Sequence, residues 1–106
     1  MMLLALALGA AATRADPVEA DLRCVAYLSG AINAAPAEQQ AGLAAGILYF
    51  VGRIDARRPG FDYRAALAPG RANAARLAHL ERDAPRCVAT IAERGRAIVA
   101  AGQRGR

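Results

Sequence analysis

Residues 37–57, with the sequence AEQQAGLAAGILYFVGRIDAR, carry the pattern that decides the fold. Their large apolar side chains recur at steps of three and four residues, which places them on one face of a helix. That face consists of Leu43, Ile47, Phe50 and Ile54, and it is widened by Leu48, Tyr49 and Val51. Pro59 and Gly60 predict the end of the helix, because proline disfavours helix at the preceding residue and glycine permits a turn. We expect this helix to be central in the fold.

The composition of the whole chain also favours helices. Hydrophobic residues make up 56% of the 106 residues, yet tryptophan is absent and aromatic residues are only 5%. Alanine, the best helix former, dominates, whereas the β-branched and aromatic residues that favour strands are sparse. The sequence therefore predicts an all-α protein, a small bundle of about four to five short helices.

On the N-terminal side, residues 18–34 carry an apolar stripe at helical spacing, and Pro17 suits the first turn of such a helix. The stripe consists of Leu22, Val25, Leu28 and Ile32. After the central helix, Asp62 can cap a short helix over residues 63–67.

Two more helices are predicted in the C-terminal part. A thin apolar stripe indicates a surface helix over residues 71–83, and Pro85 is expected at the start of a last helix that runs to residue 101. The side chains expected to face the core from this last helix are Val88, Ile91, Ala92, Ile98 and Val99.

Residues 1–15 have the order of a signal peptide. The short apolar run LLALAL at 3–8 is followed by small residues, and Thr13 and Ala15 suit cleavage before Asp16, with cleavage after Ala12 as a second option. The run is too short for a membrane span, which needs roughly 20 apolar residues. We expect a periplasmic or secreted protein with no transmembrane span, in which residues 16–106 form a single helical domain. An uncleaved N-terminal helix is the alternative.

The chain has two cysteines, Cys24 and Cys87. In an oxidising compartment we expect them to form a structural disulfide whose loop, about 60 residues long, stabilises the fold by roughly 4 kcal/mol. The spacing is too long for a CxxC redox motif, and with His79 as the single histidine a zinc site lacks ligands. Both cysteines are placed in or near the opening turns of the first and last helices, so the bond would join these helices and leave the central helix between them. Two free thiols in a cytosolic protein are the alternative.

Catalytic chemistry is not indicated. After the leader the chain has one serine, Ser29, and one histidine, His79, with no pattern that brings them together. The carboxylates are scattered, and phosphate-binding loops, metal-ligand spacings and cofactor fingerprints are absent. We therefore expect no enzyme activity, no cofactor and no metal.

Residues 49–63, YFVGRIDARRPGFDY, hold every Phe and Tyr except Tyr27. In one interpretation the aromatic side chains belong to the core, while the arginines cap the helix end, where the helix dipole favours cations and where Asp55 or Asp62 can pair with them. In the other, the segment is a site for an anion or an acidic partner. That site would consist of Arg53, Arg57, Arg58 and Arg64, flanked by Phe61 and Tyr63.

Three motifs carry a resemblance: DLRC at 21–24, YFVGRIDARRPGFD at 49–62 and RC at 86–87. With the leader, they resemble an uncharacterised family of small exported two-cysteine helical proteins of Gram-negative bacteria. This resemblance implies an exported helical fold and assigns no activity. In its two-cysteine layout alone, the chain is also similar to HdeA-type periplasmic acid-stress chaperones, which are small, all-helical and closed by one disulfide. That likeness implies an acid-activated chaperone.

The formal net charge of +5 raises the question of partners. The arginines are spread over nearly every segment without a continuous basic stripe, and export would separate the protein from cytoplasmic nucleic acid, so nucleic acid is not expected. We expect a non-catalytic protein that acts by binding an unknown protein or envelope partner, or by assembly, with a homo-oligomer left open. An acid-activated chaperone and binding of anions or envelope surfaces through the Arg53 to Arg64 region are the alternatives.

Overall fold

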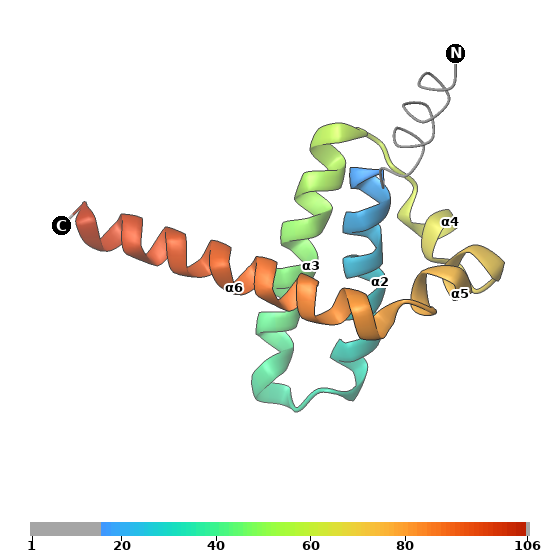
Figure 1. Cartoon of the computed structure of the whole chain (residues 1–106), viewed down its shortest axis with the longest axis horizontal. Coiled ribbons are helices and arrows are strands. Elements are labelled where there is room, and N and C mark those ends of the chain that lie inside the picture. Colours follow the sequence, from blue (N-terminus) through green and yellow to red (C-terminus); the bar gives the residue numbers. More distant parts are fainter. Residues whose placement is uncertain (1–15, 106) are drawn as a thin grey trace, which may run out of the picture.

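The computed structural model describes residues 16–105, and all the regular structure within them is α-helical (Figure 1). The helices are α2 (Pro17–Ala34), α3 (Ala37–Arg57), α4 (Tyr63–Leu67), α5 (Arg71–Leu77) and α6 (Leu80–Arg104). The predicted all-α bundle with one disulfide is confirmed. The predicted signal peptide lies outside the described residues.

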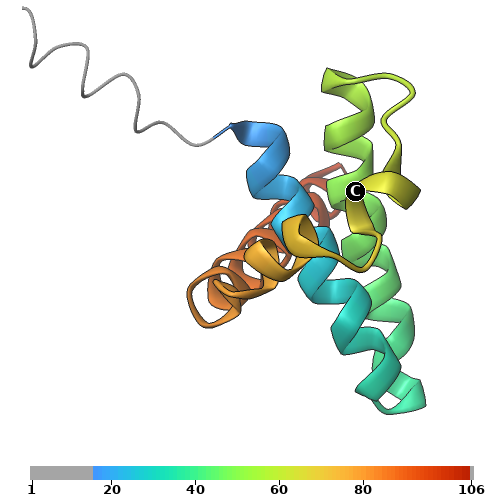
Figure 2. The same cartoon turned by 90° about the vertical axis from the view of Figure 1, so that its right-hand side faces the viewer.

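Helices α2 and α3 form an antiparallel hairpin (Figures 1 and 2). Asp16 caps α2 by accepting a hydrogen bond from the backbone N–H of Val18 at 3.1 Å, and Pro17 occupies the first helical position as predicted. The chain becomes extended at Ala35 and Pro36, and α3 begins directly afterwards. Because the connection is so short, the two helices pack against each other along their length.

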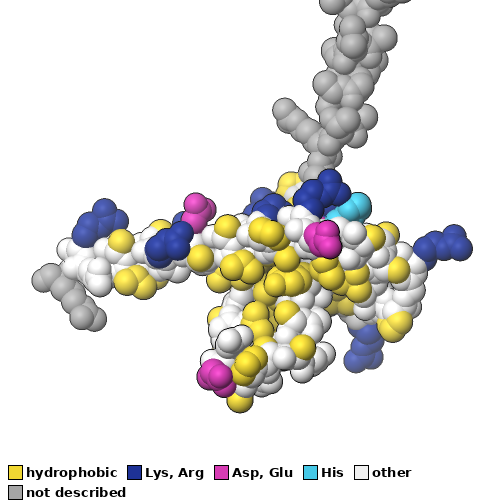
Figure 3. All heavy atoms as spheres, turned by 60° about the horizontal axis from the view of Figure 1, so that its bottom comes forward, with side chains coloured by type: hydrophobic (Ala, Val, Ile, Leu, Met, Phe, Trp, Pro, Cys, Tyr) yellow, Lys and Arg dark blue, Asp and Glu magenta, His cyan; other side chains and the backbone are white. Residues whose placement is uncertain are grey.

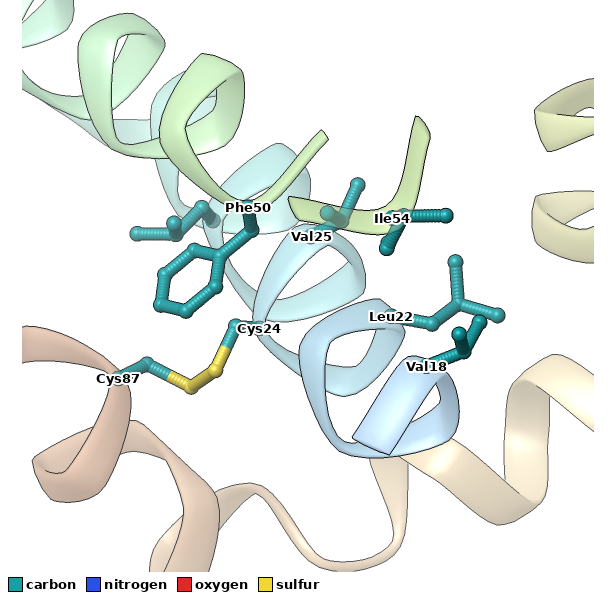
Figure 4. Packing of buried hydrophobic residues seen from close by; sticks show 8 residues of the cluster. Val18, Leu22, Cys24, Val25, Phe50, Ile54 and Cys87 are labelled. Carbon is teal, nitrogen blue, oxygen red and sulfur yellow. A yellow bond between two sulfur atoms is a disulfide. The ribbon is translucent and has the colours of Figure 1, made fainter. Parts of the chain in front are cut away.

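The core is centred on α2, so the prediction that residues 37–57 form the central helix is wrong. Helix α2 packs against α3, α5 and α6, whereas the principal packing partner of α3 is α2 alone. The buried apolar side chains of α2 are Val18, Leu22, Cys24, Val25, Ala26 and Leu28. Phe50 and Ile54 of α3 meet them (Figure 4). Leu48 does not widen the buried face, since it lies on the opposite side of α3 and is 69% exposed.

The short helices α4 and α5 lie on the other side of α2 from the free end of α6 (Figure 1). Asp62 caps α4 by accepting from the N–H of Ala65, as predicted. Helix α5 is shorter than predicted and ends at Leu77. The following helix begins at Leu80, so Pro85 lies inside α6 and does not start it. Packing explains the difference: Cys87 is fully buried and bonded to Cys24 of α2, and this packing outweighs the backbone hydrogen bond lost at Pro85.

The disulfide between Cys24 and Cys87 joins α2 to α6, with 5.5 Å between the Cα atoms (Figure 4). The pairing is as predicted, but the placement in opening turns is wrong, because each cysteine is the eighth residue of its helix. The bond therefore fastens α6 to the middle of the hairpin, which α6 crosses steeply; in Figure 2 the helix is seen nearly end-on.

Helix α6 extends far beyond the hairpin, and residues 93–105 are all exposed (Figure 1). We call residues 93–104 the arm. Three side chains of α6 that were expected to face the core are exposed: Val88 by 51%, Ile98 by 64% and Val99 by 60%. This prediction is wrong because α6 crosses the hairpin instead of running beside it. Within residues 16–105, no helix has the length and hydropathy needed to cross a membrane.

Candidate functional site

Three of the four arginines predicted to bind an anion lie at the C-terminal end of α3, and two of these face a buried carboxylate. Asp21 Oδ2 lies 3.2 Å from Nε of Arg53 and 3.6 Å from Nη1 of Arg57. These are ion-pair distances, but neither contact has the length and alignment of a hydrogen bond to this oxygen. The Asp21 side chain is only 3% exposed, so the pair joins α3 to α2 within the core.

Aromatic rings hold the Arg53 guanidinium in place. Its central carbon lies 5.6 Å from the ring centre of Tyr49 and 6.0 Å from that of Phe50. Its Nη1 also donates to the Tyr49 hydroxyl at 3.4 Å. These distances fit cation–π contacts, which favour the same position of the arginine as the ion pair does.

Arg58 pairs with the cap of α2. Its Nη2 donates to Asp16 Oδ2 at 2.9 Å, and both side chains are about half exposed. The other oxygen of Asp16 accepts from Val18, so one carboxylate caps α2 and also ties α2 to the end of α3.

Phe61 and Tyr63 form an edge-to-face pair with 5.0 Å between ring centres. The Tyr63 hydroxyl donates to Asp55 Oδ1 at 2.6 Å and lies 3.2 Å from the carbonyl oxygen of Val51. Burial, followed by the hydrogen bond and the negative charge of Asp55, raises the pKa of Tyr63 to about 12. This pair holds the start of α4 against α3.

The six predicted residues therefore do not converge on one anion. Arg53 and Arg57 pair with a carboxylate of α2, and Arg58 pairs with the carboxylate that caps this helix. Arg64 is exposed on α4 and has no ion pair within residues 16–105. Neither Asp55 nor Asp62 pairs with the arginines, because they bond to Tyr63 and cap α4. Sequence reasoning missed Asp21, although an acidic residue one turn before Val25 on the apolar stripe of α2 was a usable signal.

A second polar link joins α5 to α2 and was also missed. Arg76 donates from Nε and Nη2 to the two carboxylate oxygens of Glu19, at 2.9 and 3.4 Å, and from Nη1 to the carbonyl of Ala66 at 2.6 Å. Its side chain is only 13% exposed. Its partners lie far from it along the chain, and no sequence pattern pointed to them.

An apolar groove of about 210 Å³ lies where three helices meet. It is lined by Leu28 of α2, Gly42 and Leu43 of α3, and Val88, Ile91 and Ala92 of α6. Helices α3 and α6 approach closely beside it, since a Cβ atom at Gly46 would lie 2.7 Å from Cδ1 of Ile91. Figure 3 shows hydrophobic side chains gathered in the angle between α6 and the hairpin.

A wider hollow of about 500 Å³ lies over residues 77–82, at the turn between α5 and α6. Its polar feature is a contact of 2.7 Å between Arg82 Nη2 and His79 Nδ1. Within the described chain, no group of three or more His, Cys, Asp or Glu residues is arranged to hold a metal ion.

Comparison of the chain with protein-family models, curated proteins and solved structures gives no significant match. The predicted resemblances to the exported two-cysteine family and to HdeA-type chaperones therefore stay predictions.

Proposed function

We propose that this protein is a non-catalytic helical domain of the periplasm that acts by binding a partner protein through the arm of α6. One observation carries the proposal: the arm is helical and exposed, and it carries two large apolar side chains, Ile98 and Val99, that no other part of the described chain covers. Single exposed apolar residues are ordinary on protein surfaces. Ile98 and Val99, however, continue the apolar stripe of α6 that packs on the core. The part of this stripe on the arm is therefore an apolar surface that the rest of the described chain leaves uncovered.

The energetics of helices support the same conclusion. Isolated helices shorter than about 12–15 residues are marginal in water, and most helical stability in proteins comes from packing of an apolar face. The arm lacks packing within residues 16–105 and contains Gly95 and Gly102, which weaken a helix further. A partner that covers its apolar face would supply the missing stabilisation.

The disulfide supports export, because such bonds persist in oxidising compartments and are rare in the cytosol. Mass spectrometry of protein recovered from the periplasm tests this part. We expect a mature chain that begins near Asp16 and has lost two hydrogens at Cys24 and Cys87. An intact leader or free thiols would contradict export.

Photo-crosslinking in cells tests the binding function. A photoreactive amino acid at Ile98 should give a discrete adduct with another protein, because Ile98 lies on the proposed surface. The same amino acid at Leu48, which is equally exposed but lies on α3 away from the groove, is the matched control. No adduct from Ile98, or the same adducts from both positions, would contradict the proposal.

An acid-activated chaperone is the second candidate, favoured by the ion pairs that join the helices. Glu19 and Asp21 each pair with an arginine of another helix, and Asp16 pairs with Arg58 directly after α3. Acidification to about pH 2–3 would weaken these links and loosen the packing. Suppression of client aggregation at this pH would support the candidate, and absence of protection would exclude it.

Anion binding at the end of α3 stays an untested alternative. Arg57 and Arg58 keep 47% and 54% of their side chains exposed, yet an anion would compete there with Asp21 and Asp16. Unchanged retention of an Arg57→Gln/Arg58→Gln variant on an anionic matrix would exclude it.

A further inference from the structure

We infer that the angle between the arm and the α2–α3 hairpin accepts an amphipathic helix of a partner protein whose edges are acidic. The inference rests on the proposed function and adds the chemistry of the partner. Its basis is the apolar groove, the stripe of the arm that continues it, and the basic residues on both sides of that stripe.

The groove and the arm form one continuous apolar surface. At about 100° per residue, the large apolar side chains from Val88 onward fall within an arc of about 120°, together with three small residues, whereas Ala89, Ala97, Ala100 and Ala101 lie outside it. The residues within the arc are Val88, Ile91, Ala92, Gly95, Ile98, Val99 and Gly102. Ile91 packs on the core, and Val88 and Ala92 line the groove. Residues farther along the stripe therefore face the same side, beyond the hairpin.

The edges of this stripe are basic. Arg94 and Arg96 lie about 100° to either side of Gly95, one at each edge of the apolar arc. Neither makes an ion pair within the described chain, and Glu93, the acidic residue of the arm, lies on the opposite face. An occupant with acidic edges would complement both arginines.

Shape and composition argue against a lipid surface. The apolar stripe faces the side on which the hairpin lies, so a flat bilayer cannot reach the arm and the groove together, whereas a helix fits in the angle. The arm also lacks Trp, Phe and Leu, the side chains that anchor amphipathic helices in membranes.

Charge argues against a second copy of this chain. Pairing through the same face would bring Arg94 and Arg96 of both copies to the edges of one interface. Like charges in such positions disfavour pairing. We therefore expect a partner whose carboxylates lie opposite Arg94 and Arg96 in the complex.

Binding of synthetic helical peptides to the oxidised full-length protein tests the inference. The two peptides have the same apolar face of Leu and Ala. The residues that flank this face are Glu in one peptide and Lys in the other. We expect the Glu-edged peptide to bind at least about tenfold more tightly by fluorescence anisotropy, and to weaken with added salt. Ile98→Glu should lower its affinity by about tenfold or more, while Leu48→Glu, on the far face of α3, should leave it unchanged.

A charge exchange provides a second variant that does not depend on Ile98. Arg94→Glu/Arg96→Glu should reverse the preference, so that the Lys-edged peptide binds more tightly. Both positions are exposed, so the fold should be retained and circular dichroism would verify it.

Equal binding of both peptides, or no reversal in the exchanged variant, would overturn the inference. So would self-association of the free protein, or binding to phosphatidylglycerol vesicles, if either is lost in Ile98→Glu, since the occupant would then be a second copy or lipid. If Ile98 crosslinks to a protein in cells but the peptides show no charge preference, the proposed function stands and only this inference falls.

Discussion

Asp21 of α2 and Arg53 of α3 form an ion pair across the central hairpin, with Oδ2 3.2 Å from Nε. The two partners differ in environment, since the carboxylate is 3% exposed and the arginine side chain 39%. Arg57 approaches the same oxygen from the next turn of α3. The arginines thus reach from solvent to a buried acid and link α3 to α2.

Asp21→Asn should lower the free energy of unfolding by about 1–2 kcal/mol in urea titrations. The value is at the low end for a buried pair because both arginines stay partly hydrated. Asp16→Asn is the matched control: asparagine caps a helix as well as aspartate, so only the exposed pair with Arg58 is lost and the change should be below about 0.5 kcal/mol. Equal losses in the two variants would show that burial of Asp21 adds nothing.

Gly46→Ala and Gly52→Ala should have different effects, although both add a methyl group inside α3. At Gly52 the new Cβ meets no atom within 4 Å, so the gain in helix propensity should stabilise the fold by about 0.5–1 kcal/mol. At Gly46 it would lie 2.7 Å from Ile91 and 3.3 Å from Leu28, and the shift of these side chains should cancel the gain. Thermal unfolding measures the difference, and equal stabilisation would contradict the close approach of α3 and α6.

Removal of the disulfide in Cys24→Ala/Cys87→Ala should lower the free energy of unfolding by about 4 kcal/mol, because the sequence separation of the two cysteines is 63 residues. Urea unfolding of the variant and of the wild type, each with and without reductant, distinguishes the effect of losing the disulfide from the effect of replacing the cysteine side chains. Reductant should affect the wild type alone. A loss below about 1 kcal/mol would mean that the fold does not depend on this bond.

The pH dependence in the alkaline range should come from Tyr63. Its pKa is about 12 in the folded protein and 10.0 ordinarily, so the unfolded chain releases this proton first. The contribution of Tyr63 to stability is therefore present below about pH 10 and is lost as the pH rises to about 12. All 14 basic residues are arginine, so no lysine titrates in this interval.

The difference between the ultraviolet titrations of the wild type and Tyr63→Phe isolates this hydroxyl. Asp55→Asn should lower the pKa of Tyr63 but leave it above 10.0, because burial, the largest single cause of the shift, remains. Ionisation of Tyr63 at its ordinary pKa in the wild type would contradict the hydrogen bond to Asp55.

The helix positions could be predicted from local signals in the sequence. Pro17, Asp62 and the pair Pro59-Gly60 mark helix ends through their own backbone chemistry, and α2, α3 and α4 follow from them. The break between α5 and α6 could not be predicted, because local preference places it at Pro85, whereas the packing of α6 around the buried Cys87 moves it to residues 78–79.

The packing of the helices against one another could not be predicted from the periodicity of apolar residues. An apolar stripe shows that a helix has a face to cover, but not whether the covering element belongs to the same chain. For this reason the pattern predicts Ile98 and Val99 in the core, although they are exposed. The cluster of arginines in residues 53–64 predicts a positively charged site. It does not show that Asp21, which is distant in sequence, pairs with two of these arginines.

Amide hydrogen exchange tests the central claim most directly, namely that the first half of α6 stabilises the fold and the arm is left for a partner. In dilute purified protein, we predict that amides of residues 22–28 in α2 exchange only through global unfolding. Amides of residues 97–102 should exchange orders of magnitude faster through local opening, because no other part of the described chain packs on them. Protection of residues 97–102 equal to that of α2 would show that the arm is already covered and would contradict the account.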